Sequence, residues 1–591
     1  MNETIIKEPG IKEEKAIIKK DIKNKLQYIW HILLIVISLL LLFLAMKQFA
    51  GASKEEVFRN EELTITTLVV WICQYSVLKG ITGKSKLSLG LAIGIEVAYD
   101  IINYIIRIVR GSAITISDIV AIKTGLSVIK NINLRFEIQF LYAILFVLAI
   151  VAILIIFRKK IIQKEEGWVT RVIKIITGIA IVFILSKTNI YNGYSLWDIN
   201  EDYRTLGTPI TILRMLHNFK VEPPEGYEKS EVEKLLGSYE TEAENEEEDK
   251  PNIIVIVNES FSDYYSLYKE GKANPIEYFT ELSKEENVIS GVMYSSEFGG
   301  QTSNVEYEFL TQNSNKVIPI GSYVFQQYIT KDVNTSIVQN LKSQGYKTSA
   351  IHPWENYAYS RNKVYKLFGF DTIKFKDDIE GLEENFNNDF YTDRSTYNEL
   401  MRQIKDKEDG EKLFSYVLTV QNHIGYDNPD PNQITYSDDY KTNIYMQLTH
   451  ESSEALKEVI EELKQSDEKY ILLFFGDHQP NLDYTENNTE RPLEKYQVPF
   501  IIWANYDIEE RYDVQTSTVY LQNYLLNAAG VNKSAMNNFM EELQKYYPVI
   551  TKRFYMDLEG NLYKNNDNIS ENYEKIEEYD KVSYYNLFDN N

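Results

Sequence analysis

Cysteine and positive charge are both scarce in this 591-residue chain, and each shortage excludes a class of protein. Cys73 is the single cysteine, so the chain can form no internal disulfide and its folded parts must be stabilised by hydrophobic cores. Lysine and arginine number 62 against 86 aspartates and glutamates, which gives a net charge of −24. That balance argues against nucleic-acid binding, because nucleic-acid-binding proteins present a basic surface to phosphates.

Long hydrophobic runs are lacking after about residue 190, but several stand before it. A helix needs about 20 apolar residues to cross a hydrocarbon core of ~30 Å. Five runs approach that length and predict five transmembrane helices: Ile29–Met46, Leu63–Leu78, Leu87–Ile106, Ile138–Phe157 and Trp168–Leu185. The first run is too long for a cleaved signal peptide and lacks the small-residue cleavage site.

Basic residues predict the orientation of these helices, since short cytoplasmic loops are enriched in lysine and arginine. They gather before the first run, between the second and third, and between the fourth and fifth: Lys12, Lys15, Lys19, Lys20, Lys23 and Lys25, then Lys79, Lys84 and Lys86, then Arg158, Lys159, Lys160 and Lys164. With the N-terminus inside, five spans place everything after about residue 188 outside. We therefore predict a multi-pass transmembrane domain over residues 1–187, in the cell membrane.

Residues 188–250 are predicted to be an extracellular connector, which ends in the acidic run Glu242–Asp249. From Pro251 onward, short apolar runs alternate with helix-like stretches such as Asp332–Ser343 and Tyr440–Lys464. The apolar runs are Ile253–Val257, Thr348–Ile351, Leu413–Val420, Tyr470–Phe475 and Val498–Trp503. This alternation predicts an extracellular α/β domain with a mainly parallel central sheet over residues 251–591. We expect residues 551–591 to be terminal strands or turns packed on it.

Polar residues follow four of these runs, where an open α/β sheet binds its ligands. They are Asn258-Glu259-Ser260, His352, Gln421-Asn422-His423 and Gly476-Asp477-His478. Three of the six histidines in the chain stand at these strand ends. The clustering indicates a functional site at this edge of the sheet.

Glu259, Asp477 and His478 together supply two carboxylates and an imidazole. Such a ligand set suits a divalent cation such as Mn²⁺ or Zn²⁺. We expect Gly476 to let the backbone turn sharply, so that the two residues after it can point at one ion. Asp477 and His478 could instead simply cap a turn.

A candidate nucleophile, Thr302, follows the glycine-rich segment Glu297–Gln301 and precedes the helix-like stretch Asn304–Thr311. A glycine-rich turn into a helix presents free N–H groups and a positive dipole end to an anion. A bound divalent cation would lower the pKa of the threonine hydroxyl and make it nucleophilic near neutral pH. Thr302 could also be an ordinary helix N-cap.

A further cluster reads His352-Pro353-Trp354, then Tyr357, Tyr359 and Arg361. Arginine can donate two parallel N–H bonds to a phosphate, and the aromatic side chains could form a platform for a sugar or glycerol. The same aromatics could equally belong to the core.

Five motifs together resemble the lipoteichoic acid synthase family: N-E-S-F at 258–261, G-Q-T-S at 300–303, H-P-W…Y-x-R at 352–361, Q-N-H at 421–423 and G-D-H at 476–478. Members are sulfatase-like phosphoglycerol transferases of Gram-positive bacteria, within the alkaline phosphatase superfamily. The resemblance covers nearly the whole chain, from the five spans through the connector to the outer, sulfatase-like domain.

The resemblance implies a metal-dependent phosphotransferase that moves glycerol phosphate from phosphatidylglycerol to a cell-envelope polymer, either lipoteichoic acid or a cell-wall polysaccharide. Thr302 matches the nucleophile of the family and would form a covalent intermediate. The Mn²⁺ ligands, which could also hold Mg²⁺ or Zn²⁺, would be Glu259, Thr302, Asp477 and His478. The glycerophosphate head would be bound by His352, Arg361 and His423, with Trp354 and Tyr359 as further substrate contacts.

The chain also departs from the family pattern. The synthases place a histidine two residues before the metal-binding glutamate, where this chain has Val257, and they place a tryptophan at the position of Tyr359. After His352, Pro353-Trp354 replaces a different polar sequence. These departures leave the metal site and nucleophile unchanged, but they leave the polymer unidentified. No signal-peptidase-like site stands in residues 188–250, so we expect no release of the outer domain.

We therefore expect a two-step transfer in which His423 or His352 protonates the leaving diacylglycerol. Transfer of phosphoethanolamine or another head group is the alternative within enzymes. A non-catalytic membrane-anchored sensor is the alternative from another class, which the intact set of Thr302 and metal ligands argues against. A true sulfatase is disfavoured, because Thr302 stands where sulfatases need a cysteine or serine in C/S-x-P-x-R.

Two acidic residues, Glu96 and Asp100, lie four apart in the third span, with Asn103 on a nearby face. Acids inside a bilayer usually face a protein interior or a wet cavity. We expect them to pack against other spans or the loop at 110–137, and to help seat the outer domain, unless they lie at the outer interface.

Overall fold

A computed structural model describes residues 11–53, 57, 61–110, 113–115, 118, 137–162, 166–186, 199–217, 221–241, 250–268, 271–319, 321–482, 493–565 and 570–590. The acidic run at 242–249 and most of the loop at 110–137 lie outside these residues. The chain divides into two compact units. The first comprises Met1–Ile108, Ser112–Ile116 and Leu134–Phe219, and the second comprises Val109–Gly111, Ser117–Asn133 and Lys220–Asn591.

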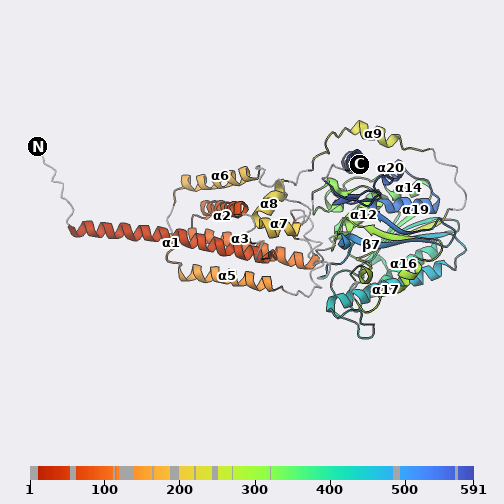
Figure 1. Ribbon diagram of the computed structural model, residues 1–591, viewed down its shortest axis with the longest axis horizontal. Helices are drawn as coiled ribbons and strands as arrows, with labels where there is room; N and C mark the ends of the chain where they lie inside the picture. Colours follow the sequence, from red (N-terminus) through yellow and green to blue (C-terminus); the bar gives the residue numbers. More distant parts are fainter. Residues whose placement is uncertain are drawn as a thin grey trace. The chain divides into compact units, whose positions relative to one another are not determined.

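The first unit is helical and confirms the five predicted spans. Its long helices are α1 (Ile11–Phe49), α2 (Glu61–Thr82), α3 (Ser85–Arg110), α5 (Ile138–Ile156) and α6 (Trp168–Leu185) (Figure 1). Each contains a stretch long and apolar enough to cross a membrane. In α6, Lys174 pairs with Glu166 at 2.5 Å, which accommodates its charge.

Two shorter helices, α7 (Ile199–Leu206) and α8 (Thr208–His217), complete the described part of this unit. Thr208 donates a hydrogen bond from its hydroxyl to Asp100 Oδ1 at 2.6 Å. Glu96 and Asp100 are both buried, and Asn103 Oδ1 accepts from the backbone N–H of Ile114 at 2.7 Å. The acids in the third span therefore face the interior of the unit, as expected.

The second unit is built on an eight-stranded sheet with the order β4-β3-β5-β1-β6-β7-β2-β8. The strands are β1 (Asn252–Asn258), β2 (Val288–Tyr294), β3 (Lys347–His352), β4 (Thr372–Phe375), β5 (Leu413–Leu418), β6 (Tyr470–Gly476), β7 (Gln497–Ala504) and β8 (Arg511–Ser517). All neighbours pair in parallel except β7, which runs antiparallel to both β6 and β2. The mainly parallel sheet is thus confirmed.

Helices cover both faces of this sheet, which explains why its strands read as unbroken apolar runs. In β1, Val255 packs into one core and Ile254 and Ile256 into the other. Figure 1 shows α12 (Thr302–Thr311), α14 (Ile337–Ser343) and α19 (Leu521–Ala529) on one face. The other face is covered by α16 (Asp393–Asp406) and α17 (Tyr440–Leu463).

Several elements differ from the prediction. The helix expected from Asp332 begins only at Ile337, because Ser336 is extended and caps the helix through the N–H of Gln339. The sequence did not predict β2, β4 and β8, because none of them is a long apolar run. Gly291 interrupts β2, β4 has only four residues, and β8 contains charged residues. In the C-terminal region, the short strands β9 (Val549–Ile550), β10 (Phe554–Met556) and β11 (Leu562–Lys564) are followed by a helix, α21 (Glu574–Tyr584).

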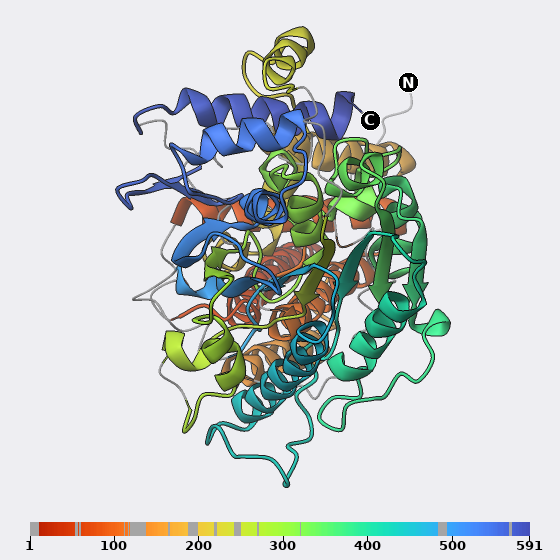
Figure 2. The same ribbon diagram turned by 90° about the vertical axis from the view of Figure 1, so that its right-hand side faces the viewer.

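Part of the predicted connector belongs to the second unit. Helix α9 (Lys229–Gly237) packs on α20 (Ala535–Gln544) and α21, and Figure 2 shows it, in yellow, beside the blue C-terminal helices. Val232 is buried in this cluster with Phe539 and Tyr579. The second compact unit therefore includes residues that the sequence assigned to the connector.

Candidate functional site

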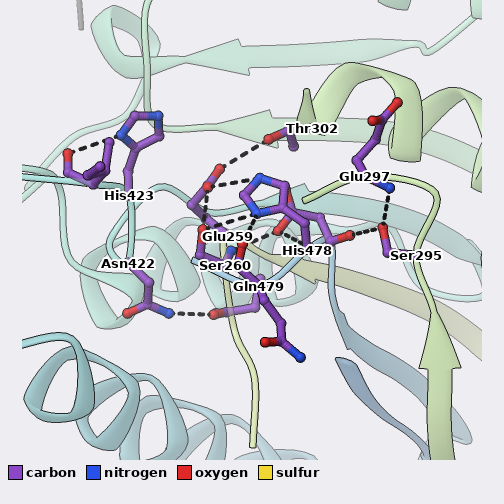
Figure 3. A network of polar contacts seen from close by, with 12 residues as sticks. Glu259, Ser260, Ser295, Glu297, Thr302, Asn422, His423, His478 and Gln479 are labelled. Atoms are coloured by element: carbon purple, nitrogen blue, oxygen red, sulfur yellow. Dashed lines mark hydrogen bonds and ion pairs between the residues drawn. The ribbon is translucent and has the colours of Figure 1, made fainter. Parts of the chain in front are cut away.

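The carboxyl ends of β1, β5 and β6 meet at the centre of the sheet, and the site lies there. The loop after β1 carries Glu259 and Ser260, and the loop after β6 carries Asp477 and His478. The strand register places Asn258 opposite Gly476, so the two loops leave the sheet side by side. Figure 3 shows Glu259, His478 and Thr302 converging on one small space.

Gly476 is required here for close approach. A Cβ at this position would lie 1.9 Å from the carbonyl oxygen of Phe261. Gly476 is not among the residues with positive φ, so the sharp turn that we expected from it is not its role. The strained residue is instead Ser260, with φ of 52°. Left-handed backbone at a non-glycine residue is characteristic of functional sites.

Ser260 ties the two loops together. Its backbone N–H donates to Asp477 Oδ1 at 2.7 Å, and its hydroxyl donates to Glu259 Oε1 at 2.9 Å. One serine therefore orients a carboxylate from each loop.

Glu259, Asp477 and His478 form a buried group that could hold a metal ion, with one donor atom from each within 4.8 Å of the others. His478 Nε2 lies 3.2 Å from Asp477 Oδ2 and 3.6 Å from Glu259 Oε1. Asp477 Oδ2 and His478 Nε2 are buried without a hydrogen-bond partner among the described residues. A cation bound between these two atoms would be coordinated by both, and would compensate for the hydrogen bonds that they lack.

The hydrogen bond at His478 Nδ1 also suits a cation. His478 Nδ1 lies 3.0 Å from the carbonyl oxygen of Gln479, so a proton on Nδ1 leaves the Nε2 lone pair for an ion. Burial, helped by the neighbouring Glu259 carboxylate and opposed by His478, raises the pKa of Asp477 to about 7. Burial alone would lower the pKa of His478, but the Asp477 and Glu259 carboxylates outweigh it and raise the pKa. A bound cation would relieve the repulsion between the carboxylates.

Thr302 is the first residue of α12, and its hydroxyl donates to Glu259 Oε2 at 3.3 Å. The N-cap is Gln301, whose side chain makes no cap hydrogen bond. Thr302 is therefore not an ordinary capping threonine. Gly299, Gly300 and Gln301 all have positive φ, and this run turns the chain so that the Thr302 hydroxyl faces the candidate metal ligands.

A buried ion pair supports the loop that precedes Thr302. Lys552, from the C-terminal strands, contacts Glu297, which also accepts from Asn304 Nδ2 at 2.8 Å. The sequence did not point to Lys552, because it lies 250 residues from Thr302 without any motif.

His352 ends β3 beside this centre and is fully engaged. Its Nδ1 lies 3.1 Å from the carbonyl oxygen of Leu418, and its Nε2 lies 3.3 Å from Arg361 Nη1. Burial, and then the Arg361 charge, hold the pKa of His352 well below its usual range. His352 is therefore a neutral imidazole that donates from Nδ1 and accepts at Nε2.

Arg361 is paired with a residue that the sequence did not single out, Glu306. Arg361 Nε and Nη2 donate to Glu306 Oε1 at 2.9 and 2.6 Å, and Tyr365 donates to Glu306 Oε2 at 2.5 Å. The Arg361 guanidinium also lies over the Tyr359 ring, 4.9 Å from its centroid. One edge of the guanidinium is thus committed to Glu306, and Nη1 is the nitrogen without a carboxylate partner in the described structure.

His423 lies near the centre, on the other side of Glu259 from Thr302 in Figure 3. Its Nδ1 is 3.3 Å from the carbonyl oxygen of Ile424, and the ring is half-buried. The Phe390 ring lies 4.9 Å from the His423 ring and 4.9 Å from that of Trp354. His423 and Trp354 therefore belong to one aromatic stack beside the site.

A buried polar network supports the loops from below. Asn258 Nδ2 and Ser452 Oγ each donate to Asp393 Oδ2 at 2.6 Å, and Asn422 Nδ2 donates to Asn258 Oδ1 at 2.9 Å. Burial raises the pKa of Asp393 to about 6. The network connects the loops after β1 and β5 to α16 and α17.

Comparison with known proteins found one matching family and several similar proteins. The sulfatase family matches residues 251–531. A putative cyclic beta-1,2-glucan modification protein of Rhizobium meliloti is 27% identical over 380 residues, which cover 60% of this chain and 58% of that protein. The lipoteichoic acid synthase of Staphylococcus saprophyticus is 27% identical over 242 residues, which cover 39% of this chain and 36% of that protein. The matched part is therefore less than two thirds of each relative.

Among solved structures, a Streptococcus pyogenes phosphoglycerol transferase, GacH, in complex with sn-glycerol-1-phosphate, superposes with a TM-score of 0.51 at 18% identity. The match covers 62% of this chain and 94% of that one. At that identity the likeness establishes the fold, and it confirms the sulfatase-like architecture of the outer unit.

Proposed function

We propose that this chain, a lipoteichoic acid synthase-like member of the alkaline phosphatase superfamily, transfers glycerol phosphate from phosphatidylglycerol to a cell-envelope polysaccharide. The observation that carries the proposal is the Thr302 hydroxyl, held at a helix N-terminus and 3.3 Å from a carboxylate of the candidate metal site. The outer unit would face the cell exterior, where that polymer is assembled.

In this proposal Glu259, Asp477, His478 and the Thr302 oxygen hold a divalent cation. Two carboxylates, an imidazole and a hydroxyl suit Mn²⁺, and Mg²⁺ or Zn²⁺ could also bind. When bound, the cation lowers the pKa of the threonine hydroxyl and offsets negative charge on the phosphate.

Thr302 acts as the nucleophile. Its oxygen forms a bond to the phosphorus of phosphatidylglycerol, while the bond from phosphorus to the diacylglycerol oxygen breaks. The phosphate lies at the N-terminus of α12, where free backbone N–H groups favour an anion. In the second half of the reaction, an acceptor hydroxyl bonds to the phosphorus and Thr302 is released.

His423 is the proton donor to diacylglycerol and the proton acceptor from the entering hydroxyl. His352 is unsuited to that role, because it is neutral, buried and bonded at both ring nitrogens. His423 is more exposed, and its Nε2 has no bonded partner in the described structure. His352 and Arg361 Nη1 remain as contacts for the glycerophosphate head.

Two observations support a polysaccharide as the acceptor: the name of one relative, and a residue that departs from the synthase pattern. A polysaccharide acceptor is favoured by the similarity to a protein named for cyclic glucan modification. Val257, where the synthases have histidine, lies buried in β1 and offers no polar contact to a substrate.

The test uses the full chain in lipid nanodiscs with Mn²⁺ and either phosphatidylglycerol or phosphatidylethanolamine. Release of diacylglycerol from phosphatidylglycerol is expected, and release from phosphatidylethanolamine alone would assign the head-group alternative. Absence of release from both lipids would contradict the proposal and favour a non-catalytic binding protein.

Metal content separates the roles of two residues. Asp477→Ala should lose the metal and reduce activity to background. Asp438→Ala, which changes a surface aspartate 90% exposed at its side chain, should retain both. An Asp477→Ala protein with metal and turnover intact would contradict the metal assignment.

A further inference from the structure

A hairpin formed by residues 383–392 lies against the loop that carries His423. Glu384 and Tyr391 bridge its two sides, and the backbone N–H of Asn385 donates to the carbonyl of Phe390 at 2.6 Å. Asp389, at the turn, has φ of 60°. The sequence Glu-Asn-Phe-Asn-Asn-Asp-Phe-Tyr thus forms a defined hairpin within the outer unit.

Three buried asparagines fix this hairpin to its surroundings. Asn388 Nδ2 donates to the carbonyls of Gln421 and His423, at 2.7 and 3.1 Å. Asn387 Nδ2 donates to the carbonyl of Asn428 at 2.9 Å, and Asn385 contacts Glu451. Asn388 therefore holds the backbone on both sides of Asn422 and fixes the position of His423.

The hairpin also carries an exposed aromatic side chain. Phe386 is 63% exposed, although Asn385 and Asn387 on either side of it are 4% and 0% exposed. A single exposed apolar residue is ordinary on a protein surface. Here the backbone on both sides is anchored, so the ring is presented to solvent from a rigid support.

Phe390, at the other end of the hairpin, is buried between Trp354 and His423. Trp354 is half-buried, and Tyr391 lies 6.5 Å from it between ring centroids. The stack forms an aromatic wall that extends from His423 to Trp354.

The chemistry of the transfer defines what meets this wall. In an in-line displacement the entering and leaving oxygens lie on opposite sides of the phosphorus. Thr302 is on one side in both half-reactions, so the leaving diacylglycerol oxygen and the entering acceptor oxygen occupy the same position on the other side. The group that protonates the first must deprotonate the second. Side chains around His423 therefore border the entry of the acceptor.

We propose that the hairpin at 383–392, together with Trp354, is the acceptor subsite and binds a pyranose chain. The apolar face of a sugar ring would pack on Trp354 beside His423, and a unit further out would pack on Phe386. The accepting hydroxyl bonds to the phosphorus, the bond from phosphorus to Thr302 breaks, and the hydroxyl proton passes to His423 Nε2. This inference rests on the proposed function.

The experiment measures how the glycerophospho-enzyme divides between water and a sugar. Full-length protein in phosphatidylglycerol nanodiscs receives methyl glycosides of glucose, galactose and N-acetylglucosamine and their disaccharides, and both hydrolysis and transfer are quantified. Phe386→Ala should lower the ratio of transfer to hydrolysis at least fivefold. Phe386→Tyr should keep the wild-type ratio of transfer to hydrolysis, because tyrosine retains an aromatic face.

Phe386→Leu separates a sugar from a lipid partner. Leucine keeps apolar contact but has no aromatic face, so it should resemble alanine. Leu558→Ala, at a 70% exposed apolar residue in the turn between β10 and β11, is the control and should leave the ratio unchanged.

Three outcomes would overturn the inference. These are a Phe386→Leu ratio equal to wild type, an unchanged ratio in Phe386→Ala, or no transfer by wild type to any sugar tested. Each can occur while diacylglycerol is still released, so each differs from failure of the proposed function, in which no diacylglycerol is released.

Discussion

Glu306 determines which nitrogens of Arg361 remain to bind a phosphate. It stands four residues after Thr302 on α12, so the two side chains lie on the same side of the helix. Its carboxylate is fully buried and holds Arg361 through two N–H groups. The glutamate thereby links the nucleophile helix to the residues expected to bind the head group.

Glu306→Gln should lower kcat/KM by roughly one to two decades, because it loses a charged hydrogen bond worth about 1.5–3 kcal/mol. Arg361→Lys should fall in the same range, and the double variant should be no worse than the poorer single one, since both changes break one unit. Metal should be retained in all three.

Glu308→Gln is the matched control for that series. It changes an equally buried glutamate two residues further on, which accepts from Ser296 instead. Its turnover should stay near wild type. Additive losses in the Glu306 and Arg361 double variant, or loss of metal from Arg361→Lys, would show that these residues support the fold rather than the phosphate site.

Because Glu308 is buried, we also expect the free energy of unfolding to depend on pH. Burial raises its pKa to about 8 from an ordinary value of 4.5. At Glu308 the folded protein therefore holds a proton that the unfolded chain has lost between these values. The contribution of Glu308 to stability is complete below about pH 4.5 and is lost as pH rises through about 8. This contribution should be on the order of 5 kcal/mol.

Melting temperatures at pH 5 and pH 8 test this prediction. The difference between them should shrink in Glu308→Gln, which cannot ionise, and should persist in Glu458→Gln, at a half-exposed surface glutamate. An equal difference in wild type and Glu308→Gln would contradict it.

At the residue scale, the sequence predicted the side chains that follow apolar strands, but not their partners. Glu259, Asp477 and His478 were found because the carboxyl ends of parallel strands lie at the same edge of the sheet. Thr302 was found because a glycine-rich turn precedes its helix. Glu306, Asp393 and Lys552 were missed because each acts from a helix or a distant segment. Such contacts depend on tertiary packing, which leaves no local pattern.

At the scale of elements, burial decided what could be predicted. β1, β5 and β6 are buried on both faces and read as apolar runs. β8 is mostly exposed and was missed. The hairpin at 383–392 was missed as well, although its Asn-Asn-Asp turn between aromatic residues is a local signal that could have revealed it.

The third span offers a prediction for the membrane unit. Glu96→Leu with Asp100→Leu should reduce both expression and activity, because Thr208 would lose its buried partner at 2.6 Å and the unit would lose packing between α3 and α8. Ile95→Leu, at a half-exposed position of the same helix, should have no effect. Unchanged yield and turnover in the double variant would refute a structural role for these acids.

At the scale of the whole molecule, the two units show different kinds of predictability. Hydropathy alone predicted the five spans of the first unit, because a bilayer admits few ways to satisfy backbone hydrogen bonds, but it did not predict α7 and α8. For the outer unit, the strand pattern predicted the fold, and the motifs were needed to predict the site. The boundary between connector and catalytic domain stays a prediction, although α9 packs with the C-terminal helices of the outer unit.

The covalent role of Thr302 is the claim on which the account depends. The most direct measurement incubates the full chain with phosphatidylglycerol labelled in its head-group glycerol, quenches in acid and locates the label by peptide mapping. The account predicts label on the peptide that contains Thr302, with release of unlabelled diacylglycerol, and neither in a Thr302→Ala protein that keeps its fold. Release of diacylglycerol by Thr302→Ala at the wild-type rate, with no label on the protein, would contradict it.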